Sequence, residues 1–257
     1  MSGPLSGIGI LITRPARQAA ALASEIAAVG GAPVVFPTIV ILPPTDRAAL
    51  DRAQQRLDYY DYAIFVSANA VEYGVGDATR WPRHLVAFAP GPGTAAALAS
   101  VGISNVRIPS TSMDSEGLLA LPEFIAVADK RVLIFRGGGG REVLGDTLAE
   151  RGAEVDYVDC YRRVKPEQRV GGLLAAWREG RIDAVTLTST EGLDNLWAVL
   201  GDEGRAKLTQ TPTFVPHPRI AERARALGLR EVIVSAPADS GLVAALLEYF
   251  AHPRPST

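Results

Sequence analysis

The chain has 257 residues, 47% of them apolar, and its 26 basic and 28 acidic side chains leave a net charge of −2. This length suits one large or two small domains, and a balanced charge without a basic run argues against nucleic-acid binding. No apolar run reaches the ~18 residues of a membrane-spanning helix, and residues 1–7 lack the features of a signal peptide. We expect a cytoplasmic globular protein.

The first part of the chain alternates short apolar runs with amphipathic stretches, which is typical of parallel strands joined by helices. Strands are expected at 8–13, 32–36, 62–66, 84–89 and 106–108. Helices are expected after Pro15, at 46–57, after Thr94, and after a cap at Asp114 or Ser115. Residues 37–44 (PTIVILPP) are extended and bounded by prolines, so we interpret them as a linker and not as a central strand.

A βαβ unit is predicted in the middle of the chain. Arg131–Phe135 has the pattern of a buried strand, Gly152 suits a helix C-cap, and Glu154–Tyr161 has the pattern of a second strand. The helix between the strands is expected to bury one face, formed by Val143, Leu144 and Leu148.

Four glycines follow Arg136 at the first turn of this unit. Glycines let a loop turn sharply and bare its N–H groups, and a helix N-terminus beside them favours an anion. The run matches neither the dinucleotide fingerprint nor the nucleotide phosphate loop. A plain strand-to-helix turn therefore remains the alternative.

The last third repeats the alternation. Strands are expected at 184–187, 213–215 and 231–234, with helices at 168–179 and up to Leu227. Asp239 or Ser240 is expected to cap a final helix that carries Leu242, Val243, Leu246, Leu247 and Phe250.

Equivalent positions recur at one offset, 122 residues, from 14 to 136, from 30 to 152 and from 67 to 189. These arginine, glycine and serine pairs each occupy matching places in the predicted elements, which indicates an internal duplication. Two proline-bounded segments, 37–44 and 160–167, predict that the chain leaves one domain and later returns.

The predicted fold class is therefore α/β, with two flavodoxin-like, doubly wound parallel-sheet domains joined by a two-stranded linker. One domain would comprise 1–36 with 168–257, and the other 45–159. Ligands of such sheets bind at the carboxyl ends of the strands. Six loops are expected at those ends, and a ligand between the domains could meet them all: 13–16, 67–70, 90–94, 136–141, 188–191 and 216–219.

Over nearly its whole length the sequence resembles the uroporphyrinogen-III synthases. The resemblance rests on ILITRP (10–15), IFVSANAVE (64–72), Gly93-Thr94, RGGGGREVLGDTLAERGAEV (136–155) and DCYRRV (159–164). It continues through LTSTEGL (187–193), the 216–219 loop before RARALGL, and the closing helix. The ordered set is more specific than any one of these motifs.

This resemblance implies an enzyme without a cofactor or metal, in agreement with a single cysteine, Cys160, and three scattered histidines. The implied substrate is hydroxymethylbilane, a linear tetrapyrrole with eight carboxylates. The family's hydro-lyases expel its terminal hydroxyl, invert the last pyrrole ring and close the macrocycle. Because the substrate stabilises its own azafulvene cation, such an enzyme needs one proton donor and a positioning cleft, but no strong nucleophile.

The family's prominent tyrosine falls at Tyr161, which is predicted to donate the proton, since a phenol is protonated at neutral pH. The alternative is that Tyr161 only packs, with its hydroxyl on a backbone carbonyl. The predicted substrate-binding residues are Arg14, Ser67, Asn69, Gly93, Thr94, Arg136, Gly137, Gly138, Arg141, Ser189, Thr190 and Arg219. Taken singly, such arginines are often surface residues, and such serines and threonines are often N-caps.

Two positions depart from the family pattern. Pro218-Arg219 stand where many members carry a threonine, and Ala68 stands where a proline is frequent. A cation at Arg219 could serve a carboxylate in place of the lost hydroxyl, so this contact stays open.

Three other functions are compatible with the sequence. They are a non-catalytic tetrapyrrole- or anion-binding module of the same fold, a nucleotide-dependent α/β enzyme, and a diverged regulatory paralogue. The second lacks the Lys and Ser/Thr of a phosphate loop. We expect a monomer, because hinged lobes must be free to close, and hydroxymethylbilane synthase is the candidate transient partner.

Overall fold

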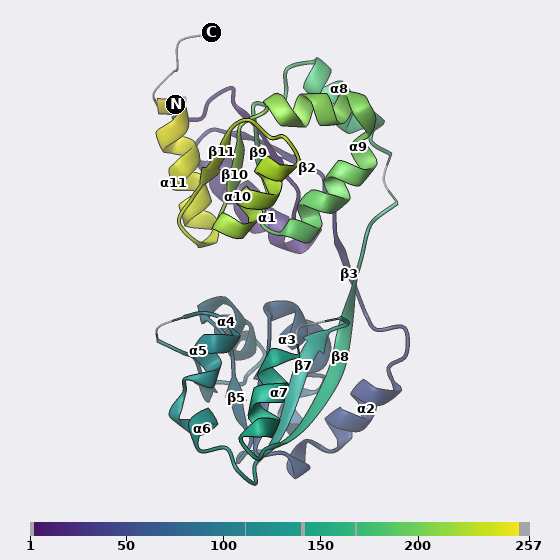
Figure 1. The fold of residues 1–257 in the computed structure, drawn as a ribbon, viewed down its shortest axis with the longest axis vertical. Coiled ribbons are helices and arrows are strands. Elements are labelled where there is room, and N and C mark those ends of the chain that lie inside the picture. Colours follow the sequence, from purple (N-terminus) through teal and green to yellow (C-terminus); the bar gives the residue numbers. More distant parts are fainter. Residues whose placement is uncertain (1–2, 111, 140–141, 168, 252–257) are drawn as a thin grey trace. The chain divides into compact units, whose positions relative to one another are not determined.

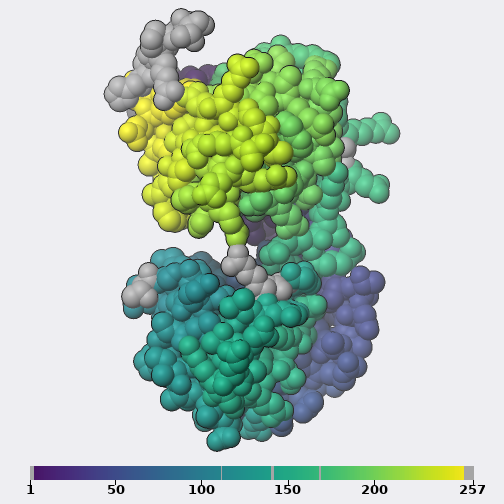
Figure 2. All heavy atoms as spheres, in the orientation of Figure 1, coloured from purple at the N-terminus to yellow at the C-terminus, as the bar shows by residue number. Residues whose placement is uncertain are grey.

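The computed structural model describes residues 3–110, 112–139, 142–167 and 169–251 (Figure 1). The chain forms two compact units, one comprising Met1–Val40 with Val164–Thr257 and the other Ile41–Arg163. Both division points lie within the two segments predicted as linkers. In the space-filling view, the visible face of unit 1 consists mainly of residues from the last third of the chain, whereas unit 2 carries residues from the middle (Figure 2).

Unit 1 is built on a five-stranded sheet in the order β11-β10-β9-β1-β2, and all its neighbouring strands are parallel. Its strands are β1 (Gly9–Ile12), β2 (Ala32–Val35), β9 (Ala184–Thr186), β10 (Thr213–Val215) and β11 (Val232–Val234). Its helices are α1 (Ala16–Ala28), α8 (Gly171–Arg178), α9 (Thr190–Gln210), α10 (Pro218–Ala226) and α11 (Ala238–Ala251).

Both faces of this sheet are covered. Successive side chains of β1 point to opposite faces, so Ile10 and Ile12 pack in the core under α1 and α11, whereas Leu11 packs in the core under α8, α9 and α10. The three inner strands β1, β9 and β10 are buried at every residue, as expected for strands covered on both faces, whereas the edge strands β2 and β11 are partly exposed.

Unit 2 contains a six-stranded sheet in the order β3-β8-β7-β4-β5-β6. Its strands are β3 (Val40–Leu42), β4 (Tyr62–Phe65), β5 (Val86–Phe88), β6 (Val106–Arg107), β7 (Arg131–Gly137) and β8 (Glu154–Val164). Its α-helices are α2 (Ala48–Gln55), α3 (Ala68–Gly74), α4 (Pro92–Ser100), α5 (Ser115–Leu119), α6 (Pro122–Ile125) and α7 (Val143–Glu150), with short 3-10 turns η1 (Leu57–Tyr59) and η2 (Ala78–Arg80). The four pairs β8–β7, β7–β4, β4–β5 and β5–β6 are parallel. This confirms an α/β fold with parallel sheets.

Three sequence predictions need correction. β8 runs three residues beyond its predicted end, because its neighbour β3 continues the sheet alongside it. Val143 is 51% exposed, since it is the first residue of α7 and lies off the face that buries Leu144 and Leu148. Helix α11 begins at Ala238, so Asp239 lies in its first turn and not at its cap.

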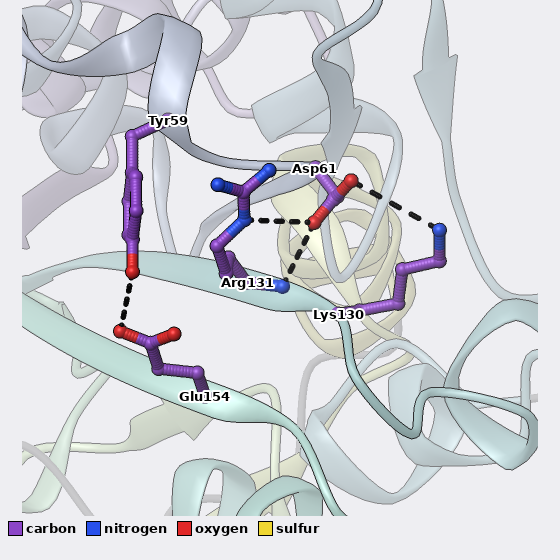
Figure 3. A network of polar contacts seen from close by, with 5 residues as sticks. All are labelled: Tyr59, Asp61, Lys130, Arg131 and Glu154. Carbon is purple, nitrogen blue, oxygen red and sulfur yellow. Dashed lines mark hydrogen bonds and ion pairs between the residues drawn. The ribbon is translucent and has the colours of Figure 1, made fainter.

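The amino ends of the unit 2 strands are held by a polar network (Figure 3). The Asp61 carboxylate accepts the backbone N–H of Arg131 at 2.9 Å and lies 3.9 Å from Lys130 Nζ. The Arg131 guanidinium lies 4.4 Å from the centre of the Tyr59 ring, and the Tyr59 hydroxyl donates to Glu154 at 2.7 Å. This network fixes the sheet edge opposite to the carboxyl ends of the strands.

Acid should weaken this network. Partial burial raises the pKa of the Asp61 carboxyl, but hydrogen bonds from Arg131 and the charges of Lys130 and Arg131 outweigh it, so the pKa lies below its usual value. The stabilisation is therefore complete above the unfolded-state pKa of about 3.9 and is lost as the pH falls through the folded-state pKa. On acidification the wild type should lose about 1 kcal/mol more unfolding free energy than Asp61→Asn, because the amide of the variant does not titrate. Urea titrations of both proteins at several pH values between 3 and 6 measure the unfolding free energy. The same dependence of this free energy on pH in the two proteins would contradict the prediction.

Candidate functional site at the carboxyl ends of the strands

Most of the predicted site residues lie at the carboxyl ends of neighbouring parallel strands. In unit 2, Ser67 follows β4, Gly93 and Thr94 follow β5, and Arg136 to Gly138 close β7, in the sheet order β7-β4-β5. In unit 1, Arg14 follows β1, Ser189 and Thr190 follow β9, and Arg219 follows β10, in the order β1-β9-β10. Parallel strands bring these residues to one edge of each sheet, where ligands of such folds bind.

Tyr161 lies on β8 with only 1% of its surface exposed. Its hydroxyl oxygen lies 3.2 Å from Ser67 Oγ and accepts a hydrogen bond from Arg163 Nη2 at 3.1 Å. The Arg163 guanidinium also lies 5.5 Å from the centre of the phenol ring. Among the described residues, the hydroxyl is hydrogen-bonded to these two side chains rather than to a backbone carbonyl, the partner expected if Tyr161 only packs.

Ser67 and Ser189 are N-caps, as their positions at helix starts suggested. Both have extended backbones, Ser67 Oγ accepts the Ala70 N–H at 3.2 Å, and Ser189 Oγ accepts the Gly192 N–H at 2.9 Å. Thr190 follows in the first turn of α9, and its Oγ1 is buried without a hydrogen-bond partner in the part of the chain that the structure describes. The first N–H groups of any α-helix lack a partner within the helix, which makes both helix starts a suitable environment for an anion.

The glycines after Arg136 form the turn and also leave room for the ring of Tyr161. A Cβ on Gly137 would lie 2.5 Å from Cε2 and 2.6 Å from Cζ of Tyr161, so only glycine fits there. The Gly138 N–H donates to the Tyr161 carbonyl at 3.0 Å, which removes it from the expected set of free donors. Gly139, with φ of 76°, takes the left-handed conformation of the turn. No sequence signal pointed to the contact between Gly137 and Tyr161.

Two of the predicted arginines are paired within the protein. Arg14 Nη1 lies 2.6 Å from Asp239 Oδ1, and Arg136 Nε lies 3.0 Å from Asp159 Oδ1. Both side chains are mostly buried, and the Arg136 guanidinium also lies 4.1 Å from the centre of the Tyr157 ring. Spacing alone did not indicate these carboxylate partners, because Asp239 is far from Arg14 in sequence.

The remaining predicted residues are less enclosed, apart from Thr94. Asn69 is half-buried in the first turn of α3, Gly93 and Arg219 are exposed, and Thr94 is buried. Arg141 lies outside the described residues.

Comparison with known proteins bears directly on this arrangement. A sequence model of the family described as "Uroporphyrinogen-III synthase HemD" matches residues 20–244. Uroporphyrinogen-III synthases of Salmonella typhimurium strain LT2 and Escherichia coli strain K12 are each 34% identical over 238 residues, which cover 91% of this chain and 97% of theirs. The chain belongs to the uroporphyrinogen-III synthase family.

Solved structures agree with this family assignment at the level of the fold. A uroporphyrinogen III synthase of Thermus thermophilus superposes with a TM-score of 0.58 at 17% identity, over 95% of this chain and 98% of that one. The enzyme from Helicobacter pylori gives 0.60 at 13% identity, over 94% and 99%. The resemblance seen in the sequence is therefore confirmed, whereas the role of each site residue stays a prediction.

Two further features bear on the chemistry of this synthase-family chain. Burial raises the pKa of the Cys160 thiol to about 12, so the sulfur is protonated at neutral pH and is no candidate nucleophile. Among the described residues, no group of His, Cys, Asp and Glu could hold a metal ion, and no helix there is long and apolar enough to cross a membrane.

Proposed function

We propose that the protein catalyses the cyclisation of hydroxymethylbilane to uroporphyrinogen III, with inversion of the terminal pyrrole ring and loss of water. The observation that carries this proposal is the 34% identity to two bacterial uroporphyrinogen-III synthases over almost their whole length. The reaction is a cyclising elimination of water, so the protein acts as a hydro-lyase.

The reaction requires two things of the protein, a proton donor and a binding site that holds the substrate in the right conformation. When the terminal C–O bond breaks, the electron pair leaves with oxygen, and the pyrrole nitrogen stabilises the remaining cation. In our proposal Tyr161 supplies the proton that turns the departing hydroxyl into water. Holding the substrate so that ring closure gives the inverted isomer supplies the rest of the rate and all of the specificity.

The carboxylates of the substrate are proposed to bind the donors at the strand ends. The helix starts after Ser67 and Ser189 suit an anion, and so does the open approach to Gly93, whose Cβ position meets nothing within 4 Å. Arginine forks suit carboxylates as well. The full proposed set comprises Arg14, Ser67, Asn69, Gly93, Thr94, Arg136, Gly137, Arg141, Ser189, Thr190 and Arg219, with Gly138 restricted to shaping the turn.

We also infer that the chain arose by duplication of one α/β unit. Residues 122 apart have matching conformations: Gly30 and Gly152 have φ of 90° and 89° after their helices. The sheet orders match too, because β2-β1-β9-β10-β11 in unit 1 parallels β8-β7-β4-β5-β6 in unit 2, the 2-1-3-4-5 order of flavodoxin-like sheets. Each repeat would then give two strands to one unit and three to the other.

A second pair of contacts supports the same inference. Asp61 accepts the N–H of Arg131 at 2.9 Å, and Asp183 accepts the N–H of Gly9 at 2.7 Å, with both partners again 122 apart. In this account 1–36 with 168–257 and 45–159 are the domains. Residues 37–44 and 160–167, which contain β3 and the end of β8, form a two-stranded linker.

The activity itself can be tested with freshly made hydroxymethylbilane. The purified protein should give mainly isomer III when the products are oxidised and the uroporphyrins are separated. Isomer I alone, at the rate of the protein-free control, would instead favour the non-catalytic binding module. Light scattering on the same sample tests the proposed monomer.

Replacing Tyr161 tests the proton source. Tyr161→Phe keeps the ring and its packing, so the free energy of unfolding should change little while kcat for isomer III falls by about 100-fold, the lower end of the usual range for general acids. Residual activity is expected, because positioning of the substrate is retained. An unchanged kcat would assign Tyr161 to packing alone.

A further inference from the structure

We propose that the proton reaches the leaving hydroxyl through Ser67, with Tyr161 behind it as the source and Arg163 setting the direction of the relay. This inference rests on the proposed synthase function and adds a route that neither the family resemblance nor the comparisons contain. Its three residues all lie in unit 2, at the carboxyl ends of β4 and β8.

Burial of Tyr161 makes direct donation difficult. With 1% of its surface exposed and Gly137 packed against the ring edge, the phenol offers almost no area to a substrate. A general acid must come within hydrogen-bond distance of the atom that it protonates. A smaller group must therefore stand between the phenol and the substrate.

Arg163 fixes the direction of the phenol proton. A guanidinium can only donate, so its 3.1 Å hydrogen bond occupies a lone pair of the Tyr161 oxygen. The phenol hydrogen must then find another acceptor, since an unpaired buried hydroxyl is costly. Ser67 Oγ, at 3.2 Å, is the remaining hydrogen-bond partner of this hydroxyl among the described residues. Tyr161 therefore donates and Ser67 accepts.

Counting the hydrogen bonds that Ser67 Oγ accepts shows that its own proton points away from Tyr161. Its oxygen accepts the Ala70 N–H at 3.2 Å and the Tyr161 hydroxyl at 3.2 Å, which fills both lone pairs. Its own hydrogen is then free to donate to a third group. Ser67 is only half-buried and stands at the strand ends where ligands bind in such folds.

The proton inventory of the step balances. Ser67 gives its proton to the departing oxygen as the C–O bond breaks, and water leaves. Tyr161 returns a proton to Ser67, and the resulting phenolate faces the Arg163 cation. The pyrrole carbon that forms the final bond loses a proton when its ring regains aromaticity, and this proton restores Tyr161.

Unit 1 lacks the relay, although it carries the matching serine. Ser189 caps α9 as Ser67 caps α3, but the residue 122 positions before Tyr161 is Ile39, which has no hydroxyl. The capping role alone therefore does not require the phenol, and the combination of serine, tyrosine and arginine is specific to unit 2.

The decisive experiment combines Ser67→Gly, Tyr161→Phe and the double variant. Glycine is a good N-cap, so Ser67→Gly should fold while removing the hydroxyl. Groups acting in series give equal losses, so we expect each single variant and the double variant to form isomer III about 100-fold more slowly than wild type. A wild-type kcat in Ser67→Gly, or a double loss equal to the product of the single losses, would overturn the relay.

Solvent isotope effects supply an independent readout. In mixtures of H2O and D2O, kcat of the wild type should curve with deuterium fraction because two protons move, whereas Tyr161→Phe should give a straight line. A straight line for the wild type would contradict the relay. If the wild type forms no isomer III at all, the proposed function fails first, and the two failures are thereby distinguished.

Arg163 is a positioning residue in this scheme. Arg163→Met removes the donor, and we expect kcat to fall about tenfold with KM unchanged. Arg162→Met is the matched control, since Arg162 is the exposed neighbour on the same strand and donates to the Pro43 carbonyl. Equal effects of the two variants would overturn the role of Arg163.

Discussion

Gly137→Ala should lower the rate of isomer III formation by about 100-fold, although it adds a single methyl group. The new Cβ would lie 2.5 Å from Cε2, 2.6 Å from Cζ and 3.0 Å from the hydroxyl oxygen of Tyr161. Real side chains do not approach this closely, so the phenol must move by a large fraction of an ångström. Its hydrogen bonds to Ser67 and Arg163 would lengthen together, and displacements of this size are enough to disable proton transfer.

The matched control is Gly145→Ala in the same unit. Its Cβ would meet the Tyr157 hydroxyl and ring at least as closely. Tyr157 contacts none of the relay residues, although its ring lies against the proposed substrate-binding residue Arg136, so this variant controls for kcat and not for KM. Overpacking costs about 1–3 kcal/mol in either variant, so both should lose similar stability in urea titrations. Only Gly137→Ala should lose kcat per folded molecule. A parallel loss of kcat per folded molecule in Gly145→Ala would show that general destabilisation, and not the position of Tyr161, limits the reaction.

Local pattern was sufficient to predict the parallel α/β architecture. Buried strands such as β1 and residues 132–135 of β7 are continuous apolar runs, and Gly152 ends its helix in the left-handed conformation that its position predicted. Local pattern failed at the ends of elements. Val143 begins its helix and escapes burial, and β8 continues past its predicted end at Tyr161 because β3 supplies a neighbour.

The site was predicted less completely, because its geometry depends on contacts between distant residues. Tyr161 and Ser67 were both named, but nothing in their spacing shows that their oxygens lie 3.2 Å apart. The Arg14–Asp239 pair joins residues from opposite ends of the chain. Arg163 was passed over, since an arginine beside another in a polar strand end resembles any surface cation. Side-chain partners of this kind follow from the tertiary fold and not from local pattern.

Phe135→Ala should destabilise unit 2 and leave unit 1 unaffected, although residues of unit 1 flank unit 2 on both sides in the sequence. Phe135 is fully buried and stacks on Phe65 with ring centres 4.4 Å apart. Truncating such a ring costs about 3–5 kcal/mol, partly through the cavity that remains. Each of the four apolar clusters lies within one unit, so this loss has no direct route into the other core.

Amide hydrogen exchange, read out by mass spectrometry of peptides, measures the local stability of each unit separately. In Phe135→Ala, amides of the described part of 41–163 should exchange faster, while those of 3–40 and 169–251 keep their wild-type rates. Phe214→Ala, which removes an equally buried ring beside Tyr249, should give the reverse pattern. Faster exchange throughout the chain in either variant would mean that the two units unfold together. If faster exchange is confined to the substituted unit, the two units unfold independently. The core formed by residues 3–40 and 169–251 is then stable even when the segment inserted between them is destabilised. The relay could then be studied by variants of unit 2 without disturbing the strand ends of unit 1.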